Sequence, residues 1–154
     1  MEQQNFTPQQ ALPKIKNYCA YQERCHAEVK EKLYGFGLHK KEVDQILSTL
    51  IEENYLNEER FAIQFAGGKF RMKQWGRVKI KYELKQRQVS DYSIKKSLKN
   101  ISDVEYIKVL KKLADEKYVS LKNEQPLIRK KKTMDHLTQK GFEMELIKTV
   151  VPNH

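Results

Sequence analysis

The stretch LKQRQVSDYSIKKSL, residues 84–98, contains an apolar framework that decides the fold. Its four apolar residues are separated by four, four and three other residues, and the same spacing occurs twice more in the chain. The three copies are Leu33, Leu38, Val43, Leu47; Leu84, Val89, Ile94, Leu98; and Leu137, Phe142, Ile147, Val151. The offsets between copies are 51 and 53 residues, and such a nearly constant offset indicates a tandem structural repeat.

Each copy predicts the end of one helix, a turn and the start of the next helix. The first apolar residue ends a helix, the second packs down from the turn, and the last two lie one turn apart on the following helix. The turn contains Gly35 and Gly37 in the first copy and Gly141 in the third, because glycine readily takes the left-handed conformation that ends a helix. The second copy has Gln88 there and begins its next helix with Ser90, a favourable N-cap.

Helical signals continue outside the framework. Val43, Ile46, Leu47, Leu50 and Ile51 follow the spacing of one helix face. Capping residues and helix-starting prolines mark further boundaries at Thr7-Pro8 with Gln10, at Asn54, at Asn57, at the Ser102–Glu105 capping box and at Pro126.

Residues 78–84 alternate apolar and polar side chains, which taken alone is typical of a strand. The repeat aligns this segment with residues 27–33, whose pattern is helical, and Ile80 and Leu84 lie one helical turn apart. We therefore expect a helix here.

The helix that follows Asn57 has Phe61, Phe65 and Met72 on its expected buried face. It also contains Gly67-Gly68, a pair that costs about 2 kcal/mol relative to alanine inside a helix. We expect either a bend at the two glycines or the close approach of a neighbouring backbone.

These patterns predict an all-α fold, a tandem array of three three-helix repeats forming an elongated, curved body. A three-helix unit buries little apolar surface alone, and stacking the units in a row buries their shared faces. We divide the chain into a flexible N-terminus (1–7), repeat 1 (8–56), the basic repeat 2 (57–101), repeat 3 (102–151) and a C-terminal tail (152–154).

Composition excludes several classes of protein. Hydrophobic residues make up 39% of the 154 residues and charged residues 32%, a balance that favours a soluble folded domain. No apolar run is long enough to span a membrane, and the N-terminus lacks the features of a secretory signal, so we expect a cytoplasmic protein. Cys19 and Cys25 are expected to be reduced, partly buried thiols, and the spacing of cysteines and histidines predicts no metal site and no cofactor.

The net charge of +10 is concentrated in one part of the chain. Residues 69–99 contain 11 basic and two acidic residues, whereas residues 1–68 contain eight basic and ten acidic ones. Such a local excess favours a polyanionic partner or an acidic groove on another protein. The candidate binding residues, which we call the cationic patch, are Lys69, Arg71, Lys73, Arg77, Lys79, Lys81, Lys85 and Arg87.

Alternatives to a binding patch remain open. Phe70, Trp75 and Tyr82 are interleaved with the charges, and the first two are better explained as core residues. A second basic run, Arg129, Lys130, Lys131 and Lys132, wraps around a helix and is better explained as solvated, although it could extend the patch. No nucleophile lies at a recognisable spacing from a base, and Gly67-Gly68-Lys69 lacks the spacing of a phosphate-binding loop, so we do not expect an enzyme.

Three segments resemble the RecX family of regulatory proteins: Arg24–Leu33, Asn54–Ala62 and Trp75–Leu84. The resemblance covers about residues 8–151 and is strongest in the first two repeats and thin in the third. Asn54 and Asn57 replace a glycine and an acidic residue that the family usually has, and both keep the capping chemistry. Gly67-Gly68 replaces bulkier residues.

The resemblance implies a specific partner. The family binds the RecA filament on single-stranded DNA and restrains its ATPase, strand exchange and co-protease activities. Charge alone would favour the alternative of a helical protein that binds single- or double-stranded DNA without reading sequence, and a third possibility is an adaptor for another acidic partner. We expect no membrane partner and a monomer.

Overall fold

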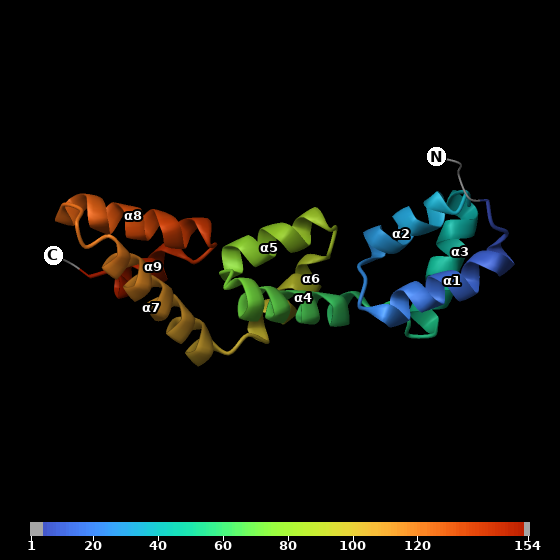
Figure 1. The fold of residues 1–154 in the computed structure, drawn as a ribbon. Helices are drawn as coiled ribbons and strands as arrows, with labels where there is room; N and C mark the ends of the chain where they lie inside the picture. Colours follow the sequence, from blue (N-terminus) through green and yellow to red (C-terminus); the bar gives the residue numbers. More distant parts are fainter. Residues whose placement is uncertain (1–4, 153–154) are drawn as a thin grey trace.

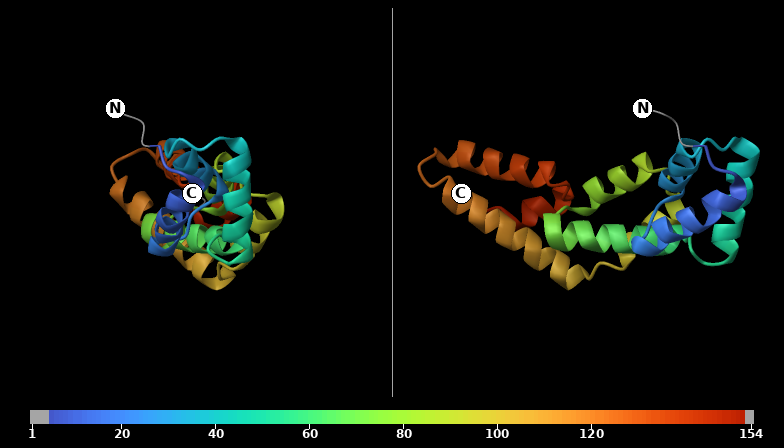
Figure 2. Two further views of the ribbon diagram at one scale, coloured as in Figure 1. Left: turned by 90° about the vertical axis from the view of Figure 1, so that its right-hand side faces the viewer. Right: turned by 45° about the vertical axis from the view of Figure 1, so that its right-hand side comes forward.

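The computed structural model describes residues 5–152, and within them it contains nine α-helices and no strand. In Figure 1 these helices follow one another in a row, with α1, α2 and α3 at one end of the molecule and α7, α8 and α9 at the other. The row is long in one view and short when seen end-on (Figure 2), and α7 runs obliquely to α4 rather than continuing its line. The predicted all-α array of three-helix units is therefore confirmed, as an elongated and bent body.

Repeat 1 comprises α1 (Pro8–Tyr21), α2 (His26–Gly35) and α3 (Lys40–Glu52), which pack on one another. Thr7 forms the expected capping box, because its side chain accepts a hydrogen bond from the Gln10 N–H and its own N–H donates to the Gln10 side chain. Phe6 is tied to the same unit, since its N–H donates to the Phe36 carbonyl over 2.9 Å. Residues 1–4 of the predicted flexible N-terminus lie outside the described residues.

Repeat 2 comprises α4 (Glu58–Lys73), α5 (Arg77–Gln86) and α6 (Asp91–Lys99), which pack on one another. Asn57 and Ser90 cap α4 and α6 through their side chains, as expected. The segment with the strand-like alternation lies in α5 and is helical, which confirms the reading taken from the repeat.

Repeat 3 comprises α7 (Asp103–Ser120), α8 (Pro126–Gln139) and the short α9 (Met144–Val150). Ser102 accepts a hydrogen bond from the Glu105 N–H, which is one half of the expected capping box, and Pro126 occupies the first turn of α8. Residues 153–154 of the predicted C-terminal tail lie outside the described residues.

The repeated framework is the core of each unit. Eleven of its twelve apolar residues are buried, and Leu98 is half-buried. The residue before the second framework position has a positive φ in all three copies: 87° at Gly37, 61° at Gln88 and 95° at Gly141. The sequence reading of this turn is therefore confirmed, although one copy builds it without glycine. The buried apolar residues form two separate clusters: repeats 2 and 3 share one, and repeat 1 has its own.

Three details differ from expectation. Met72 is 83% exposed and Ile51 is 48% exposed, although both were assigned to buried faces; each lies in the last turn of its helix. Of the two alternatives for the glycine pair, the close approach of a neighbouring backbone is wrong. A Cβ on Gly67 would meet only the Arg71 guanidinium of the same helix, and one on Gly68 would meet nothing within 4 Å.

Candidate functional site

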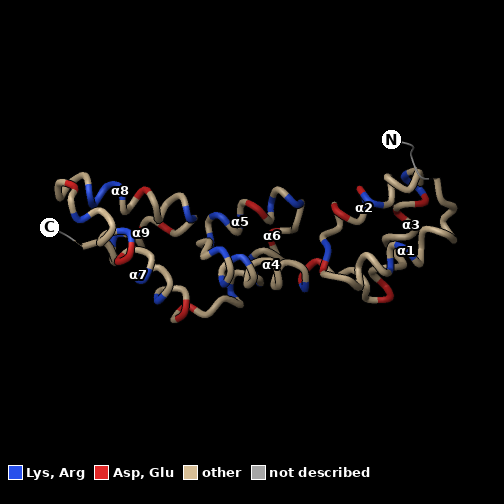
Figure 3. Tube along the Cα trace, viewed as in Figure 1, with Lys and Arg blue, Asp and Glu red and all other residues tan. Residues whose placement is uncertain are grey.

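The cationic patch lies on α4, α5 and the residue that ends α5, in the middle of the molecule (Figure 3). The helix break expected before Arg77 is present, because α4 ends at Lys73, Gln74 takes a left-handed φ of 56° and Gly76 is the N-cap of α5. The eight cations do not share one environment, because residues on the same helix differ: Arg71 is exposed, for example, whereas Lys69 lies over aromatic rings. They divide into an exposed group, one residue inside an interface, and a group that lies over aromatic rings.

The exposed group consists of Arg71, Lys73, Lys81 and Lys85. Lys85 Nζ lies 3.9 Å from a carboxylate oxygen of Asp91, and within residues 5–152 the other three have no ion pair. Arg71 also borders an open groove of about 640 Å³ at the junction with repeat 1. These side chains are free to pair with an anionic partner.

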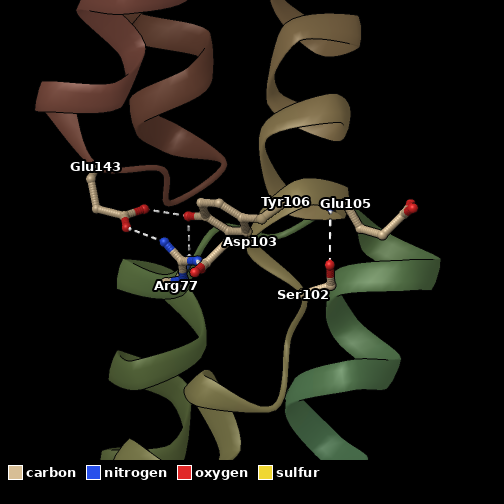
Figure 4. Close-up of polar contacts among 6 residues, drawn as sticks. All are labelled: Arg77, Ser102, Asp103, Glu105, Tyr106 and Glu143. Carbon is tan, nitrogen blue, oxygen red and sulfur yellow. Dashed lines mark hydrogen bonds and ion pairs between the residues drawn. The ribbon is translucent and has the colours of Figure 1, made fainter.

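Arg77 has a different environment, because it binds two carboxylates of repeat 3 (Figure 4). Its guanidinium donates to Asp103 over 2.5 Å and to Glu143 over 3.0 Å, and its side chain is only 23% exposed. Arg77 is therefore a structural residue that joins repeats 2 and 3. Arg77 therefore differs from Lys81 and Lys85 of the same helix, which are exposed, because its guanidinium is held by carboxylates of repeat 3.

Tyr106 completes this network from α7. Its side chain is fully buried; its hydroxyl accepts a hydrogen bond from the Arg77 N–H over 2.9 Å and donates one to Glu143. Burial raises the pKa of the Tyr106 hydroxyl far above its ordinary value, and the hydrogen bond to Glu143 raises it further. The phenol therefore stays protonated and serves as a fixed link between α5 and the turn before α9.

Two glycines allow the backbones of repeats 2 and 3 to touch. A Cβ on Gly76 would lie 2.3 Å from the carbonyl carbon of Gly141, and a Cβ on Gly141 would lie 2.2 Å from Cβ of Lys79. This closeness lets the Gly76 N–H donate to the Lys140 carbonyl over 2.8 Å and the Val78 N–H to the Gly141 carbonyl over 2.9 Å. Arg77 and Val78, the first two residues of α5, have N–H groups without a partner in their own helix, and these donate to Tyr106 and Gly141 of repeat 3.

The third group of cations lies over aromatic rings. Arg87 and Lys69 lie 4.7 and 5.5 Å from the Phe65 ring centre, and Lys69 and Lys79 lie 5.1 and 4.7 Å from that of Trp75. We call the row Arg87, Phe65, Lys69, Trp75, Lys79 the cation–aromatic ladder. Both rings are half-buried and pack against the core, as expected for Trp75, whereas Phe70 is buried and stacks on Tyr106.

The second basic run lies in the first half of α8 and is not a single cationic face. Arg129 lies 3.5 Å from the Tyr118 ring centre, and its Nε–H donates to the Tyr118 carbonyl over 2.7 Å. Lys132 pairs with Glu124 over 2.6 Å, Lys131 is exposed and Lys130 is half-buried. Part of this run therefore serves to hold α8 against α7.

Repeat 1 meets repeat 2 through polar contacts. Arg60 at the start of α4 donates to the Glu23 carboxylate and, over 3.1 Å, to the Asn54 carbonyl. Cys25 and Ala27 reach across to the core of repeats 2 and 3. Among the described residues this junction contains no contact between glycine backbones, unlike the one between repeats 2 and 3.

Other expected features can be placed directly. Both cysteines are free thiols, and they are fully rather than partly buried; burial raises the pKa of Cys19, and that of Cys25 to about 11. In the described part of the chain there is no cluster of His, Cys, Asp or Glu side chains suited to a metal ion. No helix there is both long enough and apolar enough to cross a bilayer.

Sequence reasoning missed the interface network, the ladder and Arg60. Asp103 and Glu143 lie 26 and 66 residues from Arg77, and no local pattern relates them. The ladder joins residues of α4 and α5 that become neighbours only when the helices pack. Glycines at both Gly76 and Gly141, each at a helix boundary, were the one signal available for the close approach.

Three three-helix units in a row, with a cationic middle unit, define an elongated helical-repeat protein. Residues 57–98 match the family model described as RecX, second three-helix domain, and residues 103–151 match the one described as RecX, third three-helix domain. The chain belongs to the RecX family. The match to the third domain strengthens the part of the resemblance that was thinnest in the sequence.

Relatives and solved structures agree with this assignment. The chain is 30% identical over 138 residues to "Regulatory protein RecX" of Prosthecochloris aestuarii, covering 90% of this chain and 89% of that protein. It is 26% identical to "Regulatory protein RecX" of Bacillus cytotoxicus, covering 93% of this chain but 53% of the relative, so it spans about half the length of some family members. The crystal structure of RecX from Lactobacillus salivarius has the same fold, with a TM-score of 0.86, 22% identity and 93% coverage of both chains.

The named relatives are regulatory proteins, and the chain is accordingly a non-enzymatic regulatory protein of this family, in agreement with the expectation from sequence.

Proposed function

We propose that this protein binds the RecA filament assembled on single-stranded DNA and restrains its ATPase, strand exchange and co-protease activities. Membership of a family of regulatory proteins supports the regulatory role, and the family resemblance supplies RecA as the partner. The observation that carries the proposal is the distribution of charge along the molecule: the helices form an elongated row, and the excess of cations lies on the central repeat.

That arrangement suits a large helical partner. A filament repeats along its axis and contains DNA phosphates, and an elongated body can contact several of its subunits at once. The Arg77 network and the Gly76–Gly141 contact hold repeats 2 and 3 together, so binding would not have to order them. We propose that repeats 8–56, 57–101 and 102–151 bind as one monomeric unit.

The exposed cations are the proposed contacts for the filament. Lys73, Lys81 and Lys85 lie on repeat 2, and none is tied to a neighbouring repeat through its side chain. Arg77 is not included among the proposed contacts, because a substitution there would break its ion pairs with repeat 3 and disturb the fold. The second basic run is proposed as a secondary contact through Lys131, its exposed member without an ion pair in the described residues.

A binding experiment tests this role. Pelleting of the protein with RecA filaments on single-stranded DNA compares the wild type with the variant Lys73→Glu/Lys81→Glu/Lys85→Glu. The matched control is Lys108→Glu/Lys111→Glu/Lys122→Glu, which makes the same charge change at exposed positions of repeat 3. We expect the first variant to lose binding at least tenfold and the control to change it far less. Equal binding by both variants would refute the assignment of the patch.

A further inference from the structure

The cation–aromatic ladder is unusual for a solvated charge run, because cations and rings alternate along it across two helices. Lys69 Nζ lies near both rings, 5.5 Å from the Phe65 ring centre and 5.1 Å from the Trp75 ring centre. Lys79 Nζ lies 4.7 Å from the Trp75 ring centre. Neither lysine has a carboxylate partner within residues 5–152, whereas Arg87 pairs with Glu83 over 2.9 Å.

We propose that this ladder binds single-stranded nucleic acid, with bases stacking on Trp75 and Phe65 and phosphates pairing with Lys69 and Lys79. The inference rests on the proposed function and deepens it, because it assigns the DNA strand, rather than the protein, as the contact of this part of repeat 2. It is also separable from that function, since the ladder would bind an oligonucleotide without RecA.

The physical reason lies in an exchange of partners. Without a ligand, each lysine occupies the face of a ring, which is a weak interaction for a solvated cation. When a strand arrives, each lysine can move to a phosphate while a base takes its place on the ring, and stacking of a base on an aromatic side chain is the stronger of the two ring contacts. The lysine and the aromatic ring therefore each exchange a weak contact for a stronger one.

The surroundings favour a single strand over a duplex or an acidic protein. In a duplex the faces of the bases are already stacked on one another, so only the phosphates could bind the ladder. An acidic peptide could pair with the lysines, but it has no bases to stack on Trp75 and Phe65. At its Arg87 end the ladder borders an open groove of about 630 Å³, lined by Phe61, Phe65, Lys69 and Arg87. Glu23 and Glu28 line the same groove and would repel phosphate, which confines the strand to the α4 and α5 side.

The chain contains a single tryptophan, so its emission reports on the ladder directly. The experiment titrates the full-length protein with an oligothymidylate and with an abasic deoxyribose-phosphate oligomer of equal length and charge. We expect the oligothymidylate to quench Trp75 and to bind about 100-fold more tightly than the abasic oligomer, because each of the two base stacks that the abasic oligomer lacks is worth about tenfold in affinity. Equal affinities, or an unchanged tryptophan emission with both, would overturn the proposal, because the ladder would then be a phosphate patch or no site at all.

Two variants locate the phosphate contacts. Lys69→Gln/Lys79→Gln should weaken oligothymidylate binding and lower the slope of log affinity against log salt by about 1.4, which corresponds to two phosphates on a single strand. Lys108→Gln/Lys111→Gln removes the same charge from α7 and should leave this slope nearly unchanged. The same slope for both variants would overturn the assignment to the ladder.

The two proposals fail in different ways. Inhibition of RecA without any base-dependent quenching would overturn the ladder and leave the filament role intact. Base-dependent quenching without any effect on RecA would support the ladder and overturn the filament role.

Discussion

Gly76→Ala tests the account of how repeats 2 and 3 are joined. Gly76 has φ −79° and ψ 169°, which any residue can adopt, so alanine costs nothing in local conformation. Its methyl group would, however, lie 2.3 Å from the carbonyl carbon and oxygen of Gly141 and 2.4 Å from the Phe142 nitrogen, where a relaxed contact needs about 3.5 Å or more. All three atoms belong to backbone and cannot turn aside, so the two repeats must separate by about 1 Å.

The size of the effect follows from what this separation breaks. The hydrogen bonds from Gly76 N–H to Lys140 and from Val78 N–H to Gly141 would be lengthened beyond use, each at a net cost of about 0.5–1.5 kcal/mol. Overpacking of a tight contact adds about 1–3 kcal/mol. We therefore expect Gly76→Ala to lower the free energy of unfolding by about 2–6 kcal/mol.

Urea unfolding followed by circular dichroism measures this change. Gly68→Ala is the matched control, because its Cβ would meet nothing within 4 Å and alanine is the better helix residue, so a gain of up to about 1 kcal/mol is expected. A free energy of unfolding for Gly76→Ala within about 0.5 kcal/mol of the wild type would refute the reasoning, since it would mean that the two backbones do not touch.

Three further predictions concern single residues. Gln88→Gly should raise the free energy of unfolding by about 1 kcal/mol in the same urea assay, because glycine relieves a φ of 61° at an exposed turn; a loss of stability would contradict the turn geometry. Tyr106→Phe should cost about 1–3 kcal/mol, because the Arg77 N–H and Glu143 each lose a partner. The pKa of Tyr106 is raised in the folded state, so the protonated phenol contributes stability that is fully present below about pH 10 and is lost as the pH rises further. The difference in the free energy of unfolding between the wild type and Tyr106→Phe should therefore shrink above about pH 10, and a constant difference would argue against a buried phenol. Because Cys25 is buried and its pKa is about 11, and Cys19 is buried as well, neither thiol should react with a thiol reagent at pH 8 until urea unfolds the chain; prompt modification of the folded protein would show that this part of the core opens readily.

Much of the fold could be predicted because it is encoded locally. The spacing of Leu84, Val89, Ile94 and Leu98 specifies a helix end, a turn and a helix start within 15 residues, and capping residues such as Asn57 and Ser90 act on the next few backbone groups. The repeat then resolves the ambiguous segment in α5, where the alternation of apolar residues alone favours a strand.

The faces of the helix ends could not be predicted in the same way. Met72 and Ile51 follow the apolar spacing of their helices and are nevertheless exposed. Spacing gives the direction of a side chain on its own helix, but it does not tell whether another element covers that direction.

The candidate site was harder to predict than the fold, because charge spacing does not identify partners. Arg77, Lys81 and Lys85 look equivalent at intervals of four residues, yet Arg77 binds Asp103 and Glu143 of another repeat. Trp75 was expected in the core and does pack there, but the two lysines over its ring come from different helices. Which cations are free is set by packing between repeats.

The central claim is that the protein acts on the RecA filament rather than on DNA alone. The most direct measurement is ATP hydrolysis by RecA on single-stranded DNA while this protein is titrated in, with binding to the same DNA measured without RecA at equal salt concentration. The account predicts that hydrolysis falls at sub-stoichiometric amounts of protein, at concentrations too low to coat the bare DNA. Hydrolysis that is unchanged, or that falls only when the DNA is already coated, would contradict it.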